Sequence, residues 1–288
     1  MGNTYSANLV TESLKKGALT ILQNKFSPLR AIARTWEPDP VKPRATCEIK
    51  FVKSGATTQK NATNFETSGD SVIDAIPVTI DQYSQSFQIS NADLQGGLAL
   101  DDLVKANVKT FCSTIMGVVL APVTVAKFTA HPAYVSSAAA FGFGDMAQLR
   151  ATIKKADEKN LILDGEYFGA VTNQPGYFQP AGTTPGDGWK PFGWDFIGEN
   201  TDWAGAGAGV RGLALSPQAL GVVCGLPAQA PNSGNVLQRE VIDLPELGIK
   251  VASHLWFSLA TRSLWASFDL MLGAHEGDIT AAVLIRDS

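Results

Sequence analysis

The chain has 288 residues, of which 45% are hydrophobic and 17% charged, so it can bury a substantial core. Its formal net charge of −4 argues against a dedicated nucleic-acid binder, because such a protein needs a basic face to neutralise phosphates. The three cysteines are far apart, so no disulfide framework or CxxC metal motif is predicted.

No secretory signal is recognisable at the N-terminus. The most apolar run, 115–126, is shorter than the roughly 20 residues that cross a bilayer. We therefore expect a soluble protein made in the cytoplasm, with no membrane partner.

The N-terminal region is predicted to be a short helix followed by an extended arm. Apolar residues recur at helical spacing over 8–22, which predicts an amphipathic helix. The next segment, 26–44, contains four prolines, and proline removes backbone donors and disfavours helix before it. We expect this arm to lie extended along a surface.

A β-hairpin follows, with one arm over 46–52 and a return arm over 76–80. Between the arms lies a polar tip, 54–70, that has almost nothing to bury. A two-stranded hairpin is marginally stable by itself in water, so a long projection is most useful when a neighbouring copy covers it. This pattern indicates assembly rather than catalysis.

The longest predicted helix begins near Leu98, after a strand over 83–90, and ends at Pro122. Its apolar residues recur at i, i+3 and i+4 for about six turns, which predicts one apolar face and a rod roughly 30–35 Å long. Such a helix can form the backbone of a flat domain. The apolar positions are Leu100, Leu103, Val104, Val108, Phe111, Cys112, Ile115, Met116, Val119 and Leu120.

The remaining sequence predicts a mixture of helices and strands, ending in antiparallel strands from Arg239 to Ile285. Between them lies a Gly- and Pro-rich loop that contains several aromatic residues. In chain order, the middle segments are a helix over 144–160, a strand at 161–163, a buried strand at 167–171, the aromatic loop over 173–209, a strand at 210–215 and a short helix over 217–223.

No enzyme site, cofactor or metal is predicted. Gly207 to Gly212 fits GxGxxG, but a dinucleotide site needs these glycines to open a helix, and the residues after them read as a strand. The three histidines lack metal-ligand spacing, and His254 lies in an alternating apolar strand, which is typical of a packed or edge histidine. The segment 273–278 is better explained as a turn than as a metal site.

The aromatic loop has two interpretations. Its tryptophans, Trp189, Trp194 and Trp203, lie among Asn, Asp and Gly residues and could stack on sugar rings. Alternatively, they form a small satellite core beneath a long loop, which we favour.

In its order of parts, the chain resembles the major capsid proteins of tailed bacteriophages, whose Hong Kong 97-type shell fold encapsulins also use. Several local stretches resemble the family at corresponding places, and their order is the stronger argument. These stretches are 78–83 and 87–90 before the long helix, 160–168, 211–217 and 265–273.

This resemblance implies an α+β phage capsid shell fold with a defined division of the chain. The implied parts are an N-terminal arm (1–45), an extended β-hairpin loop (46–80), a peripheral domain with the spine helix (81–130 and 236–288) and an axial domain (131–235).

The function implied is that of a structural subunit of a virion. It would self-assemble through pentamers and hexamers into an icosahedral capsid around double-stranded DNA, which it would contact weakly and non-specifically. Implied partners are further copies of the chain, a separate scaffolding protein, a portal and a decoration protein. Before assembly the subunit would lie in the host cytoplasm.

Inter-subunit contacts are expected in three places: the hairpin, the N-terminal arm and the aromatic loop. The hairpin residues are Lys53, Thr57, Lys60, Asn61 and Phe65, the arm residues are Arg30, beside Ala31, and Arg34, and the loop residues are Trp189 and Trp194.

Three alternatives remain at this stage. An encapsulin-like compartment would enclose protein cargo, and a phage tail or other structural protein would also use long β-loops for polymerisation. A carbohydrate-binding module would depend on the aromatic loop alone.

Overall fold

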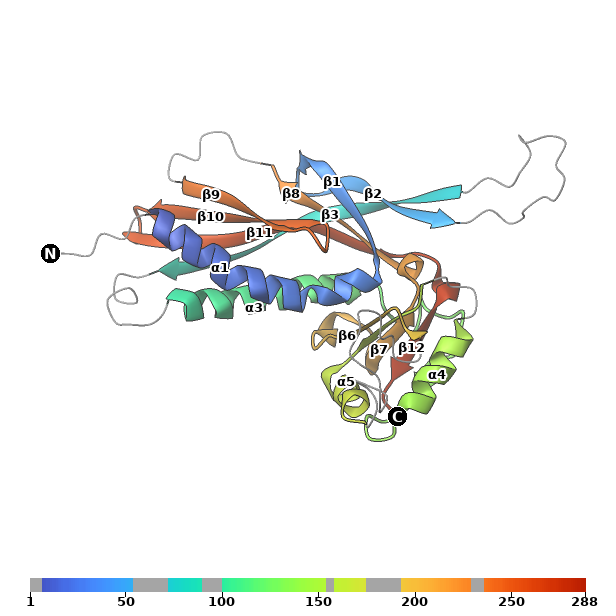
Figure 1. Cartoon of the computed structure of the whole chain (residues 1–288). Coiled ribbons are helices and arrows are strands. Elements are labelled where there is room, and N and C mark those ends of the chain that lie inside the picture. Colours follow the sequence, from blue (N-terminus) through green and yellow to red (C-terminus); the bar gives the residue numbers. More distant parts are fainter. Residues whose placement is uncertain (1–6, 54–71, 90–99, 154–157, 175–192, 229–235) are drawn as a thin grey trace.

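The computed structural model describes residues 7–53, 72–89, 100–153, 158–174, 193–228 and 236–288. They form two lobes (Figure 1). The larger lobe is a seven-stranded sheet with two long helices beneath it, and the smaller lobe is a five-stranded sheet with two short helices.

The helices are α1 (Ala7–Lys25), α3 (Leu100–Leu120), α4 (Phe143–Thr152) and α5 (Gly165–Thr172), with short 3₁₀ turns η1 (Ser27–Ala31), η4 (Trp203–Gly205), η5 (Pro217–Ala219) and η6 (Ile279–Ala281). The strands are β1 (Ala33–Val41), β2 (Ala45–Lys53), β3 (Val72–Ile89), β4 (Tyr134–Val135), β5 (Asn160–Leu163), β6 (Phe196–Glu199), β7 (Val210–Leu215), β8 (Leu220–Pro227), β9 (Val236–Leu244), β10 (Ile249–Ser258), β11 (Ser263–Glu276) and β12 (Ala282–Arg286).

Strand β11 organises the larger sheet. The order is β1-β8-β11-β10-β9, and β3 pairs with β11 as well as with β2. Because β3 occupies the opposite edge of β11, β8 and β10 lie end to end along one edge, each paired with a different part of β11. The Pro-rich arm becomes strand β1, which pairs in parallel with β8 at the edge of the sheet, a position where proline is tolerated.

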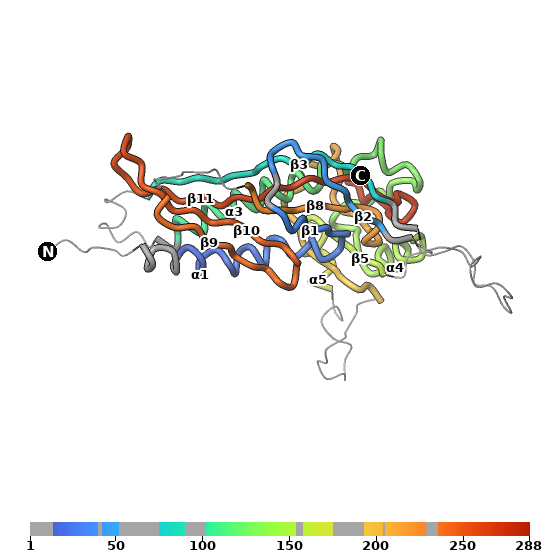
Figure 2. The backbone as a smooth tube through the Cα atoms, turned by 90° about the horizontal axis from the view of Figure 1, so that it is seen from above, coloured from blue at the N-terminus to red at the C-terminus, as the bar shows by residue number. Residues whose placement is uncertain are grey.

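The main core lies between this sheet and the helices α1 and α3 (Figures 1 and 2). Phe111 of α3 is its centre, with ring centroids 6.5 Å from Phe26 and 6.4 Å from Phe268 of β11. The long apolar helix predicted from the i, i+3, i+4 series is thus confirmed as α3. Residues 102–120 are long and apolar enough to cross a membrane by length and composition, but their apolar side chains face this core.

The smaller lobe has its own core and contains the last strand of the chain. Its sheet order is β4-β12-β7-β5-β6, with α4 and α5 packed against it. Trp194, Tyr167 and Phe141 are its largest fully buried side chains. A separate hydrophobic cluster gives this lobe the character of a second folding unit.

The predicted domain boundaries are wrong at two strands. β8 falls within the range assigned to the axial domain, 131–235, but it pairs with β1 and β11 in the larger sheet. β12 falls within the peripheral range, 236–288, but it pairs with β4 and β7 in the smaller sheet. The chain therefore crosses between the lobes more often than the two predicted boundaries, after 130 and after 235, allow.

Three predicted elements also differ in type or length. Residues 167–171 form helix α5 and not a strand, because Tyr167 and Val171, four residues apart, both point into the small core. The helix predicted over 144–160 ends at Thr152, and β5 begins at Asn160. The predicted loop over 173–209 contains strand β6.

The helix predicted over 217–223 is the turn η5 followed by strand β8. Residues 220–225 are all buried, because β8 lies between two neighbouring strands and is covered on both faces. Such a strand shows no alternation of apolar and polar residues, so its sequence resembles that of a buried helix.

Candidate assembly surfaces

The β2–β3 hairpin extends beyond the end of the larger sheet (Figure 1). Its strands pair antiparallel from Ala45 opposite Ile80 to Lys53 opposite Val72, which confirms the predicted hairpin. Alternate residues of β2 face opposite sides, since Ile49 and Phe51 are buried and Glu48 and Lys50 are exposed.

The base of the hairpin is anchored to its own subunit, which the sequence prediction missed. A small third core joins hairpin side chains to β8 and β11: Ile49, Phe51, Val78, Ile80, Val223 and Met271. Two glycines permit this close packing. A Cβ on Gly221 of β8 would lie 2.6 Å from Ile49, and one on Gly273 of β11 would lie 2.7 Å from the carbonyl oxygen of Thr79. The projecting strands are therefore held rigidly at their base.

Of the hairpin residues predicted as contacts, Lys53 is the last residue of β2, beside the tip. Thr57, Lys60, Asn61 and Phe65 lie outside the described residues.

The two arginines of the N-terminal arm bind the turn between β9 and β10 of the same chain. Arg30 Nη2 forms an ion pair with Glu246, and Arg34 Nη1 donates to the carbonyl oxygen of Leu247 at 2.8 Å. Burial lowers the pKa of Arg34. Both guanidinium groups thus fasten the arm to the larger sheet, and their contact with a neighbouring subunit stays a prediction.

Two tryptophans of the 173–209 segment belong to hydrophobic cores. Trp194 is 1% exposed in the core of the smaller lobe, and Trp203 is 6% exposed against the main core. The prediction of Trp194 as an inter-subunit contact is wrong, because its side chain is enclosed by the subunit itself. Trp194 fits the satellite-core interpretation, whereas Trp203 belongs to the main core and Trp189 lies outside the described residues.

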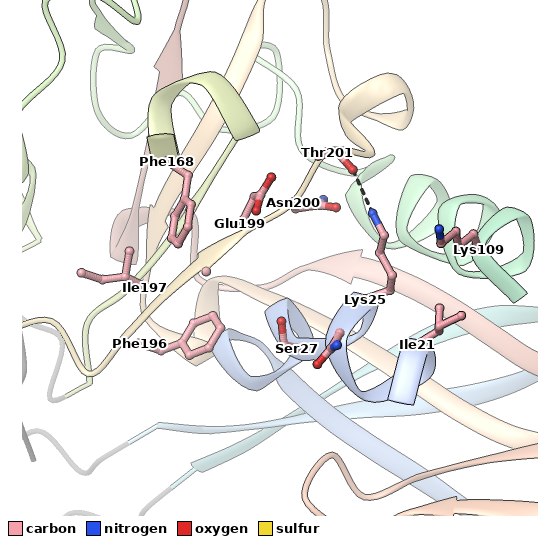
Figure 3. Close-up of a pocket in the computed structure, with 12 residues that line it drawn as sticks. Ile21, Lys25, Ser27, Lys109, Phe168, Phe196, Ile197, Glu199, Asn200 and Thr201 are labelled. Atoms are coloured by element: carbon pink, nitrogen blue, oxygen red, sulfur yellow. Dashed lines mark hydrogen bonds between the residues drawn. The ribbon is translucent and has the colours of Figure 1, made fainter. Parts of the chain in front are cut away.

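A groove of about 450 Å³ separates the two lobes (Figure 3). Lys25 and Lys109 contribute to it from α1 and α3, and Phe168 and Phe196 from α5 and β6. Lys25 Nζ donates to Thr201 Oγ1 at 3.2 Å, so the lobes are hydrogen-bonded to each other at this edge of the groove. The groove is the junction of the lobes.

Among the described residues, no three His, Cys, Asp or Glu side chains lie close enough together to bind a metal ion. Burial raises the pKa of both Cys112 and Cys224 to about 12, so these thiols stay uncharged and act as apolar core groups. Gly207–Gly212 leads into strand β7, as predicted, and so does not open a helix for a phosphate.

Three exposed apolar side chains lie along β9 and in the turn after β10. Leu237 and Val241 of β9 are 55% and 38% exposed, and Leu259, in the turn after β10, is 73% exposed. Leu237 and Val241 lie on the face of β9 opposite to the buried Ile242 and Leu244, and neither was predicted as a surface site.

No protein-family model matches the sequence, and no curated protein is significantly similar to it. Solved structures do match. A virus-like particle from Pyrococcus furiosus superposes with a TM-score of 0.53 at 11% identity, over 96% of this chain and 98% of that chain. The capsid of an empty GTA particle has a TM-score of 0.51 at 10% identity, over 92% and 90%. The capsid of the native GTA particle gives 0.50 at 12% identity, over the same shares. The chain therefore has the α+β capsid shell fold that its sequence resembles.

Proposed function

We propose that this chain is the structural subunit of an icosahedral viral capsid, built from pentamers and hexamers and enclosing double-stranded DNA. The observation that carries the proposal is the shared fold over nearly the whole length of both this chain and the virus-like particle subunit. The match covers 96% of this chain and 98% of that chain, so it is not limited to one lobe.

The proposed mechanism is geometric. The larger lobe would be the peripheral domain, with α3 as its spine, and the smaller lobe the axial domain nearer the capsomer centre. The β2–β3 hairpin, anchored through Ile49 and Phe51, would lie over one neighbour, and the N-terminal arm would contact another. Each contact is weak by itself, but closure of the shell requires all of them to break together before a subunit leaves.

The partners in this proposal are further copies of the chain, a separate scaffolding protein, a portal and a decoration protein. The net charge of −4 suits a container that contacts packaged DNA weakly. The subunit would lie in the host cytoplasm before assembly and in the virion afterwards, with a structural and not an enzymatic role.

Removing the hairpin tip tests this mechanism. Replacement of residues 55–68, which lie outside the described residues, by a short Gly-Ser turn leaves the anchoring core of Ile49 and Phe51 intact. We expect thermal unfolding of the subunit to stay the same while the yield of particles falls sharply. Normal particles from this variant would remove the hairpin from the mechanism.

The contents of the particles test the viral role. Nuclease-protected DNA inside particles purified from infected cells is the expected result. An enclosed enzyme without DNA would instead select an encapsulin-like compartment with the same fold.

A further inference from the structure

The outer face of the larger sheet, turned away from α1 and α3, carries a partly buried polar cluster. It consists of Arg239 on β9, His254 on β10, and Ser267 and Asp269 on β11, and is called the outer-face cluster below. His254 lies directly opposite Ser267 on one neighbouring strand and opposite Arg239 on the other. Three adjacent strands therefore bring these side chains together.

Asp269 is the centre of the cluster and is only 3% exposed. Its Oδ2 accepts a hydrogen bond from Ser267 Oγ at 2.7 Å and lies 3.4 Å from His254 Nδ1. On β3, Gln82 Nε2 donates to the other carboxylate oxygen at 3.5 Å. A buried carboxylate requires such partners, because an ion without them is strongly disfavoured away from water.

His254 is poorly prepared to carry a positive charge. Its side chain is 26% exposed, and its Nε2 is buried without a hydrogen-bond partner in the part of the chain that the structure describes. With a proton on Nδ1 facing Asp269, the neutral ring has an acceptor at Nε2. Protonation would add a buried N–H with no acceptor, which costs desolvation free energy.

The charges around the ring oppose each other. Asp269 faces it from β11, and the guanidinium of Arg239 faces it from β9. Further along the same face, Lys250 Nζ of β10 lies 4.0 Å from Asp243 of β9. The opposite charges of this ion pair largely cancel, so the pair has little net effect on His254. Burial lowers the pKa of His254, Asp269 raises it and Arg239 lowers it, with a net lowering from the ordinary value.

The cluster lies where β8 ends and β10 takes its place beside β11. Arg239 Nη2 donates to the carbonyl oxygen of Pro227, the last residue of β8, at 3.4 Å. Arg239 thereby links β9 to the end of β8, and β8 in turn supports β1 and the base of the hairpin.

We propose that His254 is a pH-sensitive switch in this sheet, whose protonation places two cations side by side and loosens the link between β9 and the end of β8. This inference goes beyond the proposed shell role and does not depend on it. The sign follows from the lowered pKa: neutral His254 stabilises the fold above about pH 6.5, the ordinary value for histidine, and this stabilisation is lost as the pH falls below it.

The test is thermal unfolding of the purified native protein at about pH 8 and about pH 5, for the wild type and His254→Gln. Glutamine can still donate to Asp269 but does not titrate. We expect the fall in Tm between the two pH values to be smaller in His254→Gln, by about 2–4 °C. His131→Gln is the matched control, because His131 is a half-buried histidine away from the cluster, and it should keep the wild-type fall. Equal falls in the wild type and His254→Gln would overturn the proposal.

A second variant keeps the proposal testable if His254→Gln does not fold. Arg239→Gln removes the neighbouring cation, so the protonated form of His254 is less disfavoured. We expect its Tm to fall less than that of the wild type between the same pH values, even though its Tm at pH 8 is lower because the contact with Pro227 is lost. A fall as large as that of the wild type would contradict the role given to Arg239 and His254.

Discussion

Individual residues determine how closely the two lobes approach each other. The turn η4 lies against α3, where Ser113 Oγ donates to Asp202 Oδ1 just before the turn begins. A Cβ on Gly205 of η4 would overlap the carbonyl oxygen of Gly117 in α3. Glycine at 205 therefore permits a backbone contact between α3 and the segment that leads into β7 of the smaller lobe.

Gly205→Ala is expected to lower the free energy of unfolding by about 1–3 kcal/mol, because the added methyl group has no space beside the backbone of α3. Gly117→Ala is the matched control. A Cβ there meets nothing within 4 Å, and alanine is favoured over glycine in a helix by about 1 kcal/mol. Urea unfolding of both variants checks this pair, and equal midpoints would show that the close approach is not required.

The burial of Trp194 could not be predicted from the local sequence around it. Its loop is rich in Gly and Pro, which suggests exposure, yet the side chain is buried beside Met146, Leu149 and Tyr167. These neighbours come from α4 and α5, and no local pattern indicates that the loop returns to cover them. The predicted contact at Trp194 failed for this reason.

At the scale of elements, the hairpin is a projection with an apolar root. The ring of Phe51 lies so close to Gly221 and Gly277 that a Cβ on either would be 2.7 Å from it. The sequence predicted the hairpin and its polar tip but not this packing, by which one face of the hairpin base belongs to a core.

Phe51→Ala is expected to lower the free energy of unfolding by about 3–5 kcal/mol. The side chain is only 3% exposed, and its removal would leave a cavity in the small third core. Hydrogen exchange should increase first along β2 and the paired part of β3. Lys50→Ala, on the exposed side of the same strand, should leave exchange unchanged. Uniform exchange across the whole sheet in Phe51→Ala would contradict a local anchoring role.

Elements with strong periodicity were predictable from the sequence. The series from Val104 to Val119 identified α3, the alternation around Ile49 identified the hairpin, and the alternation from Ile249 identified the C-terminal strands. Helix α5 and strand β8 were not, because a short or fully buried element has no alternation to reveal its type. The assignment of β8 and β12 to opposite lobes depends on pairing between distant segments.

At the scale of the whole molecule, β2 and β3 project beyond the two lobes, whereas α1 and β1 pack into the larger lobe (Figures 1 and 2). Arg30 and Arg34 fasten the root of the arm, and the third core fastens the root of the hairpin. In the proposed shell, these anchors transmit the contacts of each projection to the rigid sheet.

The central claim, that this chain forms a closed shell, is tested most directly by the mass and shape of the purified native protein. Multi-angle light scattering gives the mass, and negative-stain electron microscopy gives the diameter. We predict particles of megadalton mass and uniform diameter. A stable monomer or dimer that assembles neither alone nor when co-expressed with a scaffolding protein would contradict the account.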